Sequence, residues 1–371
     1  MIKDFLRSKD SGETINRRPM TLFHNRRAWQ IESEQLRISV MECGGHTAEM
    51  TWKSTGVNPL WIQDRPTIDP DQFDPEIHGD LYGNNCEGRL MSGVLGHNLC
   101  LPYWGNPSDA EYRAGMTCHG ETNVIRWQAL TYEQDRLTIE ARLPESGLRV
   151  ERTLRCCGPI VHFDTVAENL TPLDRPFAWC EHVTLGPPFL TAEDTRFFGT
   201  LGEGFRTNSD ASQRFFWPTG VGQILCDLTR YSEHPHSDLI NAFLVNSPND
   251  YASIAAWNPR LGLLFGHVFS AREFPWLSVW ENHDERHMAR GMEFSTTPVD
   301  GSMKALVAAP RLLNTPTFEW LDAKSCLRKS FFAFSLAIPA DFRGVSSVHC
   351  DGKTLRIFEI ETGNALTLPV S

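Results

Sequence analysis

The feature that most constrains the fold of this chain is a series of short segments in which apolar and polar residues alternate. Alternation with a period of two is typical of a strand that has one buried face. Turn residues separate the segments and no helical stretch lies between them, which favours antiparallel strands in a sandwich or barrel. Five such segments follow one another: Val124–Leu130, Leu137–Leu143, Leu148–Leu154, Val161–Ala167 and Phe177–Val183.

The pattern extends towards both ends of the chain. Residues 36–52 alternate around a Gly-Gly break, which predicts a hairpin, and later strand candidates include Lys304–Ala309. Residues 63–88, rich in Asp, Pro, Gly and Asn, and residues 199–220 are expected to be loops.

These observations predict the fold class and the domain organisation. We expect an all-β protein built as a large antiparallel β-sandwich. Residues 29–371 are predicted to form one domain, because no linker or repeat divides them. The polar, arginine-rich residues 1–28 are expected to form an N-terminal arm or an edge strand.

Charge and composition exclude several classes of protein. The net charge is −11 at pH 7, whereas nucleic acids and anionic membranes need a basic face, so neither is an expected partner. No stretch is apolar enough for a signal peptide or a membrane-spanning helix, so the expected location is the cytoplasm. The ten cysteines form no Cys-x-x-Cys pair, which favours reduced thiols. Without a P-loop or a Gly-x-Gly-x-x-Gly motif, no cofactor is predicted.

One predicted strand carries two ionisable side chains shortly before a rigid turn. Glu181 and His182 stand near the end of an apolar strand that runs into Gly186-Pro187-Pro188, and proline cannot continue the ladder of a sheet. Histidine gives and takes protons near neutral pH, so His182 is a candidate for acid–base work. The alternative is that His182 merely ends the strand.

Two further side chains occupy comparable positions. His119 precedes a glycine after a polar segment, and Glu293 lies in an apolar strand that ends in Thr-Thr-Pro. An acid and a base on opposite sides of a small pocket are what proton transfer at a hemiacetal requires. Taken singly, His119 can equally be a loop residue bonded to its own turn, and Glu293 can face solvent.

Two pairs of histidines have the spacing of metal ligands. They are His234 with His236, and His283 with His287. Both pairs lie in very polar segments, for which solvated loops are the more economical interpretation. We therefore predict no metal site.

Four segments, in this order, resemble the galactose mutarotase-like (aldose 1-epimerase-like) superfamily. Gly96–Gly105, followed by His119-Gly and a tryptophan, is similar to the first histidine segment of that family. The Glu151-Arg-Thr-Leu-Arg hairpin with the Asn-Leu-Thr turn is similar to its arginine–asparagine hairpin. Trp179–Leu190 and Arg290–Pro298 are similar to its second histidine segment and its glutamate segment. The likeness extends from about residue 30 to the C-terminus.

The resemblance implies a fold and an activity. The fold would be the galactose mutarotase-like supersandwich, and the activity would interconvert the α and β anomers of a free sugar. His182 would then be the general acid at the ring oxygen and Glu293 the general base at the anomeric hydroxyl. His119 would assist by hydrogen-bonding the ring oxygen, and Trp104 would stack on the sugar.

Some assignments stay open. Asp238 stands where the family often has a substrate-binding acid, and Glu281 competes with Glu293 for the role of base. Where the family's aldose 1-epimerases have an Asn-Arg pair, His97 and Asn98 stand instead. The expected partner is a monosaccharide or a sugar derived from a glycan. The competing hypothesis is a carbohydrate-binding β-sandwich without catalysis, and both a monomer and a homodimer remain possible.

Overall fold

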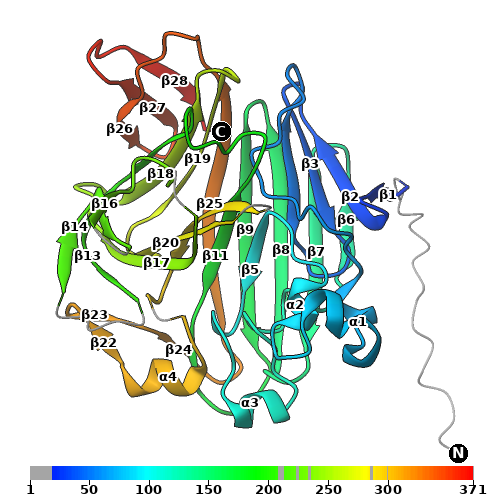
Figure 1. Ribbon diagram of the computed structural model, residues 1–371. Coiled ribbons are helices and arrows are strands. Elements are labelled where there is room, and N and C mark those ends of the chain that lie inside the picture. The colour runs from blue at the N-terminus through cyan, green and yellow to red at the C-terminus, as the bar shows by residue number, and fades with distance from the viewer. Residues whose placement is uncertain are drawn as a thin grey trace, which may run out of the picture.

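The computed structural model describes residues 19–207, 213–222, 225–232, 235–284, 287–298 and 300–370, except for the side chains of residues 236–238. These residues form two large antiparallel sheets that pack face to face, with small sheets and short helices around them (Figure 1). The predicted all-β sandwich is confirmed.

The larger sheet holds eleven described strands in the order β1-β2-β3-β4-β5-β11-β21-β20-β17-β13-β14. Their bounds are Thr21–Phe23 (β1), Arg26–Glu32 (β2), Leu36–Met41 (β3), Thr47–Trp52 (β4), His97–Cys100 (β5), Cys180–Leu185 (β11), Leu201–Arg206 (β13), Arg214–Phe216 (β14), His236–Val245 (β17), Trp276–His283 (β20) and Met288–Ser295 (β21).

The second sheet holds eight described strands in the order β12-β18-β19-β25-β9-β8-β7-β6. Their bounds are Gln128–Tyr132 (β6), Arg136–Leu143 (β7), Leu148–Cys157 (β8), Ile160–Asn169 (β9), Arg196–Gly199 (β12), Tyr251–Asn258 (β18), Leu263–Ser270 (β19) and Cys326–Ala337 (β25). Consecutive strands β6 to β9 form a meander, as the sequence pattern of this region predicts.

Small elements decorate the two sheets. The short strands are Arg175–Phe177 (β10), Thr219–Val221 (β15), Leu225–Asp227 (β16), Arg311–Leu312 (β22), Thr315–Pro316 (β23), Glu319–Leu321 (β24), Val345–Cys350 (β26), Thr354–Glu359 (β27) and Ala365–Pro369 (β28). The helical segments are Pro70–Gln72 (η1), Pro75–Tyr82 (α1), Gly88–Met91 (α2), Asp109–Arg113 (α3) and Met303–Ala308 (α4). Among the described residues, no helix is long and apolar enough to cross a membrane.

The main core fills the space between the two large sheets. Phe163 of β9 and Phe331 of β25 are cross-strand partners whose rings stack 4.7 Å apart, and the ring of Phe294 on β21 meets Phe331 from the opposite sheet. A second apolar cluster, which includes Trp257, lies between the eight-stranded sheet and the C-terminal strands β26, β27 and β28. These strands cap one end of the molecule in Figure 1.

Three segments differ from the predicted secondary structure, and in two of them a helix-capping residue accounts for the difference. Within residues 63–88, Asp74 caps the start of α1, its side chain accepts a hydrogen bond from the backbone N–H of Glu76, and Pro75 occupies the first turn. Residues 303–308 form α4 and not a strand, because Ser302 caps a helix there. Residues 199–220 contain strands β13, β14 and β15 in place of one loop.

The N-terminal segment is described only from residue 19. Strand β1 is the edge of the larger sheet and pairs with β2, which runs across the expected boundary between residues 28 and 29. Residues 1–18 lie outside the described part of the chain. The division into an arm and one domain therefore stays a prediction.

Candidate active site

Four polar side chains form a row across one face of the larger sheet. Strand β11 lies between β5 and β21, and its register pairs His182 with Asn98 on one side. The register with β21 places Glu293 on the other side of His182. Strand β20 follows, with Ser278 opposite Glu293. Cross-strand partners share a face of a sheet, so Asn98, His182, Glu293 and Ser278, here called the polar row, point to the same side.

His182 and Glu293 form the centre of the row. Nε2 of His182 lies 3.2 Å from Oε1 of Glu293, although the angles do not make a hydrogen bond. The side chain of Glu293 is 1% exposed and that of His182 is 15% exposed. Neither carboxyl oxygen of Glu293 has a hydrogen-bond partner among the described residues. Among the described residues, the imidazole of His182 is the ion-pair partner of this carboxyl group.

The absence of a side chain at Gly291 leaves the space that the carboxyl group of Glu293 occupies. A Cβ atom on Gly291 would stand 2.3 Å from Oε1 of Glu293. The two residues are two positions apart on β21 and so face the same side of the sheet. Any side chain at position 291 would displace the carboxyl group.

Burial shifts the pKa values of this pair in opposite directions. Removal from water disfavours charge, so it raises the pKa of Glu293 well above its ordinary value. Burial, and then the proximity of His119, lower the pKa of His182 well below its ordinary value. Both shifts favour the uncharged forms of the pair, a protonated carboxyl group and a neutral imidazole, whose Oε1 and Nε2 atoms lie 3.2 Å apart.

His119 lies at the rim of the row. Its ring meets that of His182 edge-on, with centroids 5.1 Å apart. The residue adopts a left-handed backbone, with a φ of 58°, and its Nδ1 accepts a hydrogen bond from the backbone N–H of Gly105. Gly120 follows because a Cβ there would lie 1.9 Å from the carbonyl oxygen of Leu101. Glycine at position 120 is thus required by the loop, and Nε2 of His119 remains as the nitrogen that carries the proton.

The tryptophans near the row differ in accessibility. Trp104 stacks on His119 with a centroid distance of 6.4 Å, but it is 2% exposed, and its Nε1 has no partner among the described residues. Trp280 on β20 is half-buried and packs on the same small cluster, which contains Cys100, Cys180 and Ile240. Trp280, which sequence reasoning missed, offers the more accessible indole ring.

The remaining predicted residues are not part of the row. Glu281 points to the opposite face of β20 from Ser278 and forms a buried ion pair with Arg290. The side chain of Asp238 lies outside the described part of the chain. Its neighbour Leu239 pairs with Glu281, so the backbone of Asp238 lies beyond the level of Glu281 along the sheet, away from Ser278.

The opposite face of β11 carries a very different carboxylate. Glu181, next to His182, faces the space between the sheets and is fully buried. Arg152 donates two hydrogen bonds of 2.9 Å to it, and His97 and the indole of Trp179 contact it at 2.8 and 3.0 Å. Although burial opposes ionisation, Arg152 and then His97 lower the pKa of Glu181 to about 2. Glu181 is therefore a charged structural residue.

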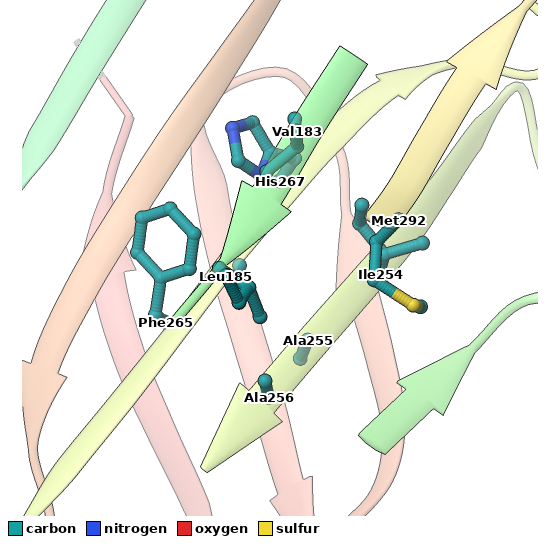
Figure 2. Close-up of a pocket in the computed structure, with 9 residues that line it drawn as sticks. Val183, Leu185, Ile254, Ala255, Ala256, Phe265, His267 and Met292 are labelled. Atoms are coloured by element: carbon teal, nitrogen blue, oxygen red, sulfur yellow. The ribbon is translucent and has the colours of Figure 1, made fainter. Parts of the chain in front are cut away.

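A small apolar cavity between the sheets lies behind the row (Figure 2). Val183 and Met292, next in sequence to His182 and Glu293, line it from the larger sheet. His267 reaches it from β19, and burial lowers the pKa of this histidine well below its ordinary value. With apolar walls, this cavity is part of the core.

No metal site is apparent among the described residues, because no three His, Cys, Asp or Glu side chains are placed to share an ion. His287 contacts Asp64 and Asp284 at 3.0 Å, and Nδ1 of His283 lies 2.8 Å from the carbonyl oxygen of Ser232. His234 and the side chain of His236 lie outside the described residues.

Sequence comparison gives no relatives, whereas structural comparison gives many. The chain matches no protein-family model and no curated protein. A solved structure of a proposed aldose 1-epimerase from Klebsiella pneumoniae aligns with a TM-score of 0.64 and 15% identity, over 85% of this chain and 81% of that one. A galactose mutarotase-like protein from Clostridium acetobutylicum aligns with a TM-score of 0.59 and 12% identity, over 86% of this chain and 98% of that one.

A third structure agrees with these two. It is a galactose mutarotase related enzyme from Lactobacillus acidophilus, which aligns with a TM-score of 0.57 and 10% identity over 84% of this chain and 98% of that one. At such identities, the likeness establishes the architecture and leaves the activity to be argued from the side chains.

Proposed function

Because this chain has the galactose mutarotase-like fold, we propose that it interconverts the α and β anomers of a free sugar by acid–base catalysis of ring opening and closure. One observation carries the proposal: Nε2 of His182 lies 3.2 Å from a fully buried carboxyl group, Glu293, that has no other partner among the described residues. Perturbed pKa values without a compensating structural partner favour a functional site.

The mechanism follows from the proton that the pair shares. The anomeric hydroxyl and the ring oxygen of a sugar are bonded to the same carbon, so groups a hydrogen-bond length apart can reach both. Transfer of the carboxyl proton from Glu293 to Nε2 of His182 first gives a carboxylate and an imidazolium. Glu293 then takes the proton of the anomeric hydroxyl, while His182 gives its proton to the ring oxygen. The bond between C1 and the ring oxygen breaks and leaves an aldehyde. Rotation about the C1–C2 bond and the reverse proton transfers then close the other anomer.

The surroundings of the pair suit this reaction. Each proton transfer by a positioned group is worth roughly a hundredfold to ten-thousandfold in rate. Nε2–H of His119 supports the ring oxygen as negative charge develops there. The half-buried ring of Trp280 and the cluster that it joins form an apolar wall, and aromatic walls of this kind pack against the apolar face of a sugar.

The test is the relaxation of freshly dissolved α-anomers, followed by optical rotation or by the anomeric proton signals. Wild type should accelerate equilibration of at least one aldose in a panel, and both His182→Ala and Glu293→Gln should lose the effect. If a sugar raises the melting temperature of wild type but no sugar equilibrates faster, the protein is a carbohydrate-binding β-sandwich without catalysis. Acceleration that survives in both variants would refute the assigned roles.

A further inference from the structure

The outer members of the polar row have no assigned role. Asn98 and Ser278 are 2% and 0% exposed, and the side-chain oxygen of each has no hydrogen-bond partner among the described residues. A buried polar atom without a partner costs about 1–3 kcal/mol, and most such atoms in folded proteins are paired. Two of them flanking one acid–base pair point to a ligand that hydrogen-bonds at both ends of the row.

The order of the row is fixed by the sheet. Asn98 on β5 is the cross-strand partner of His182, and Ser278 on β20 is the partner of Glu293. Neighbouring strands are about 4.8 Å apart. Asn98 therefore stands one strand beyond the acid, and Ser278 stands one strand beyond the base on the other side.

The edge of a pyranose has the same order of groups. The ring oxygen joins C5, which carries the C6 group, to C1, which carries the anomeric hydroxyl, and C1 is bonded to C2 with its hydroxyl. The successive polar groups are thus the C6 hydroxyl, the ring oxygen, the anomeric hydroxyl and the C2 hydroxyl. The proposed roles of His182 and Glu293 fix the two middle groups.

We infer that Asn98 binds the C6 hydroxyl and Ser278 binds the C2 hydroxyl of an aldohexopyranose, so that the row reads four consecutive groups along one edge of the sugar. This inference rests on the proposed function and deepens it, since it names the substrate class and the orientation of the ring. The amide of Asn98 can accept and donate, and the hydroxyl of Ser278 can do either, which suits a hydroxyl partner at each end.

The test combines variants with sugars that lack one group each. Two sets are used: D-galactose with L-arabinose and 2-deoxy-D-galactose, and D-glucose with D-xylose and 2-deoxy-D-glucose. In each set the pentose lacks C6 and the deoxy sugar lacks the C2 hydroxyl. The kcat/KM for anomer exchange is measured by NMR for wild type, Asn98→Ala and Ser278→Ala. Ser335→Ala is the control, because Ser335 is also fully buried in a strand with an unpaired hydroxyl, but in the other large sheet.

The expected pattern is selective. Asn98→Ala should lower kcat/KM roughly two- to tenfold for the hexose and leave the pentose unchanged, since a neutral hydrogen bond contributes about that much. Ser278→Ala should lower it similarly for the hexose and leave the 2-deoxy sugar unchanged. Ser335→Ala should match wild type on every sugar. Each comparison is made between sugars on one protein preparation, so a change in the stability of the variant cannot produce the pattern.

The contrary outcomes separate the two claims. Two outcomes would overturn the orientation while the proposed activity stands. One is an equal loss of kcat/KM on all sugars. The other is the reverse assignment, in which Asn98→Ala lowers kcat/KM for the hexose but not for the 2-deoxy sugar. An active wild type with both variants unchanged would overturn the inference alone. Wild type without activity on any sugar would overturn the proposed function and the inference with it.

Discussion

Glu181 and Glu293 are two equally buried carboxyl groups on neighbouring strands, and their surroundings are opposite. Glu181 faces the space between the sheets, where Arg152, His97 and Trp179 satisfy it and its pKa falls to about 2. Glu293 faces the other side of the same sheet, has no hydrogen-bond partner among the described residues, and burial raises its pKa. A buried carboxylate with a full set of partners holds a fold together, whereas one without partners is available to react.

The comparison also separates stability from activity. Removal of one partner from a buried ion pair lowers the free energy of unfolding by about 3–5 kcal/mol, because the other charge stays buried without a counter-charge. An unpaired carboxyl group offers no such contribution. Substitutions at the two positions should therefore have crossed effects, one on folding and the other on turnover.

The largest effect is expected for Glu293→Gln. Loss of the base should lower kcat/KM for anomer exchange roughly a hundredfold to ten-thousandfold. The melting temperature should stay the same or rise, because burial disfavours the ionised form that this carboxyl group has in the unfolded chain at neutral pH, and the amide removes that cost of folding. Calorimetry and NMR exchange on one preparation measure both quantities. A variant that loses stability along with activity would place Glu293 with Glu181 as a structural residue.

Glu181→Gln should have the opposite profile. The neutral amide leaves the Arg152 guanidinium without its counter-charge, so the free energy of unfolding should fall by about 3–5 kcal/mol. Denaturant titration measures the loss. Glu168→Gln is the matched control, because Glu168 pairs with Arg149 at the surface, with 38% and 28% of the two side chains exposed, and such pairs contribute at most about 1 kcal/mol. Equal effects of the two substitutions would refute the structural role of Glu181.

The dependence of stability on pH should also differ. The pKa of Glu181 falls from 4.5 to about 2 on folding, so its stabilisation is present above pH 4.5 and is lost as pH falls towards 2. The drop corresponds to about 3 kcal/mol. The pKa of Glu293 is raised instead, so wild type loses stability as pH rises above 4.5 towards that raised value. The free energy of unfolding, measured from pH 2 to 9, should depend less on pH on the acid side in Glu181→Gln and on the alkaline side in Glu293→Gln. The same pH dependence as wild type in both variants would contradict both assignments.

A smaller effect is expected for Gly291→Ala. The added methyl group would stand 2.3 Å from Oε1 of Glu293 and displace the carboxyl group from His182. Misplacement by about 1 Å can cost up to roughly a hundredfold, so a tenfold to hundredfold fall in kcat/KM is expected. Gly79→Ala in α1 is the control and should leave kcat/KM unchanged. Full activity of Gly291→Ala would show that the position of the carboxyl group is not critical.

Much of the fold could be predicted from the sequence, because alternation with a period of two is a local property. Helices α1 and α4 could not, since each depends on one capping residue, Asp74 or Ser302, and not on a long periodic stretch. The placement of His182, Glu293 and His119 close together was implied by family resemblance and not by pattern.

The register of the sheet decided what the sequence left open. Glu281 and Glu293 lie on strands joined by a hairpin, and a shift of one residue in the register exchanges the faces to which they point. The observed register turns Glu281 to the buried side, towards Arg290, and turns Glu293 to the row. Ser278 and Trp280 were missed for the same reason, because their place beside Glu293 and Gly291 depends on the register of this hairpin. Asn98 was missed because its partner His182 comes from a strand far away in the sequence.

The most direct test of the central claim is the rate of anomer exchange in Glu293→Gln and Glu281→Gln, measured by NMR at low temperature and normalised to folded protein. Both substitutions replace a fully buried carboxyl group by its amide, on adjacent strands and opposite faces of one sheet. If Glu293 is the base, Glu293→Gln abolishes exchange and Glu281→Gln keeps it while losing stability. Loss of exchange in Glu281→Gln with retention in Glu293→Gln would contradict the account.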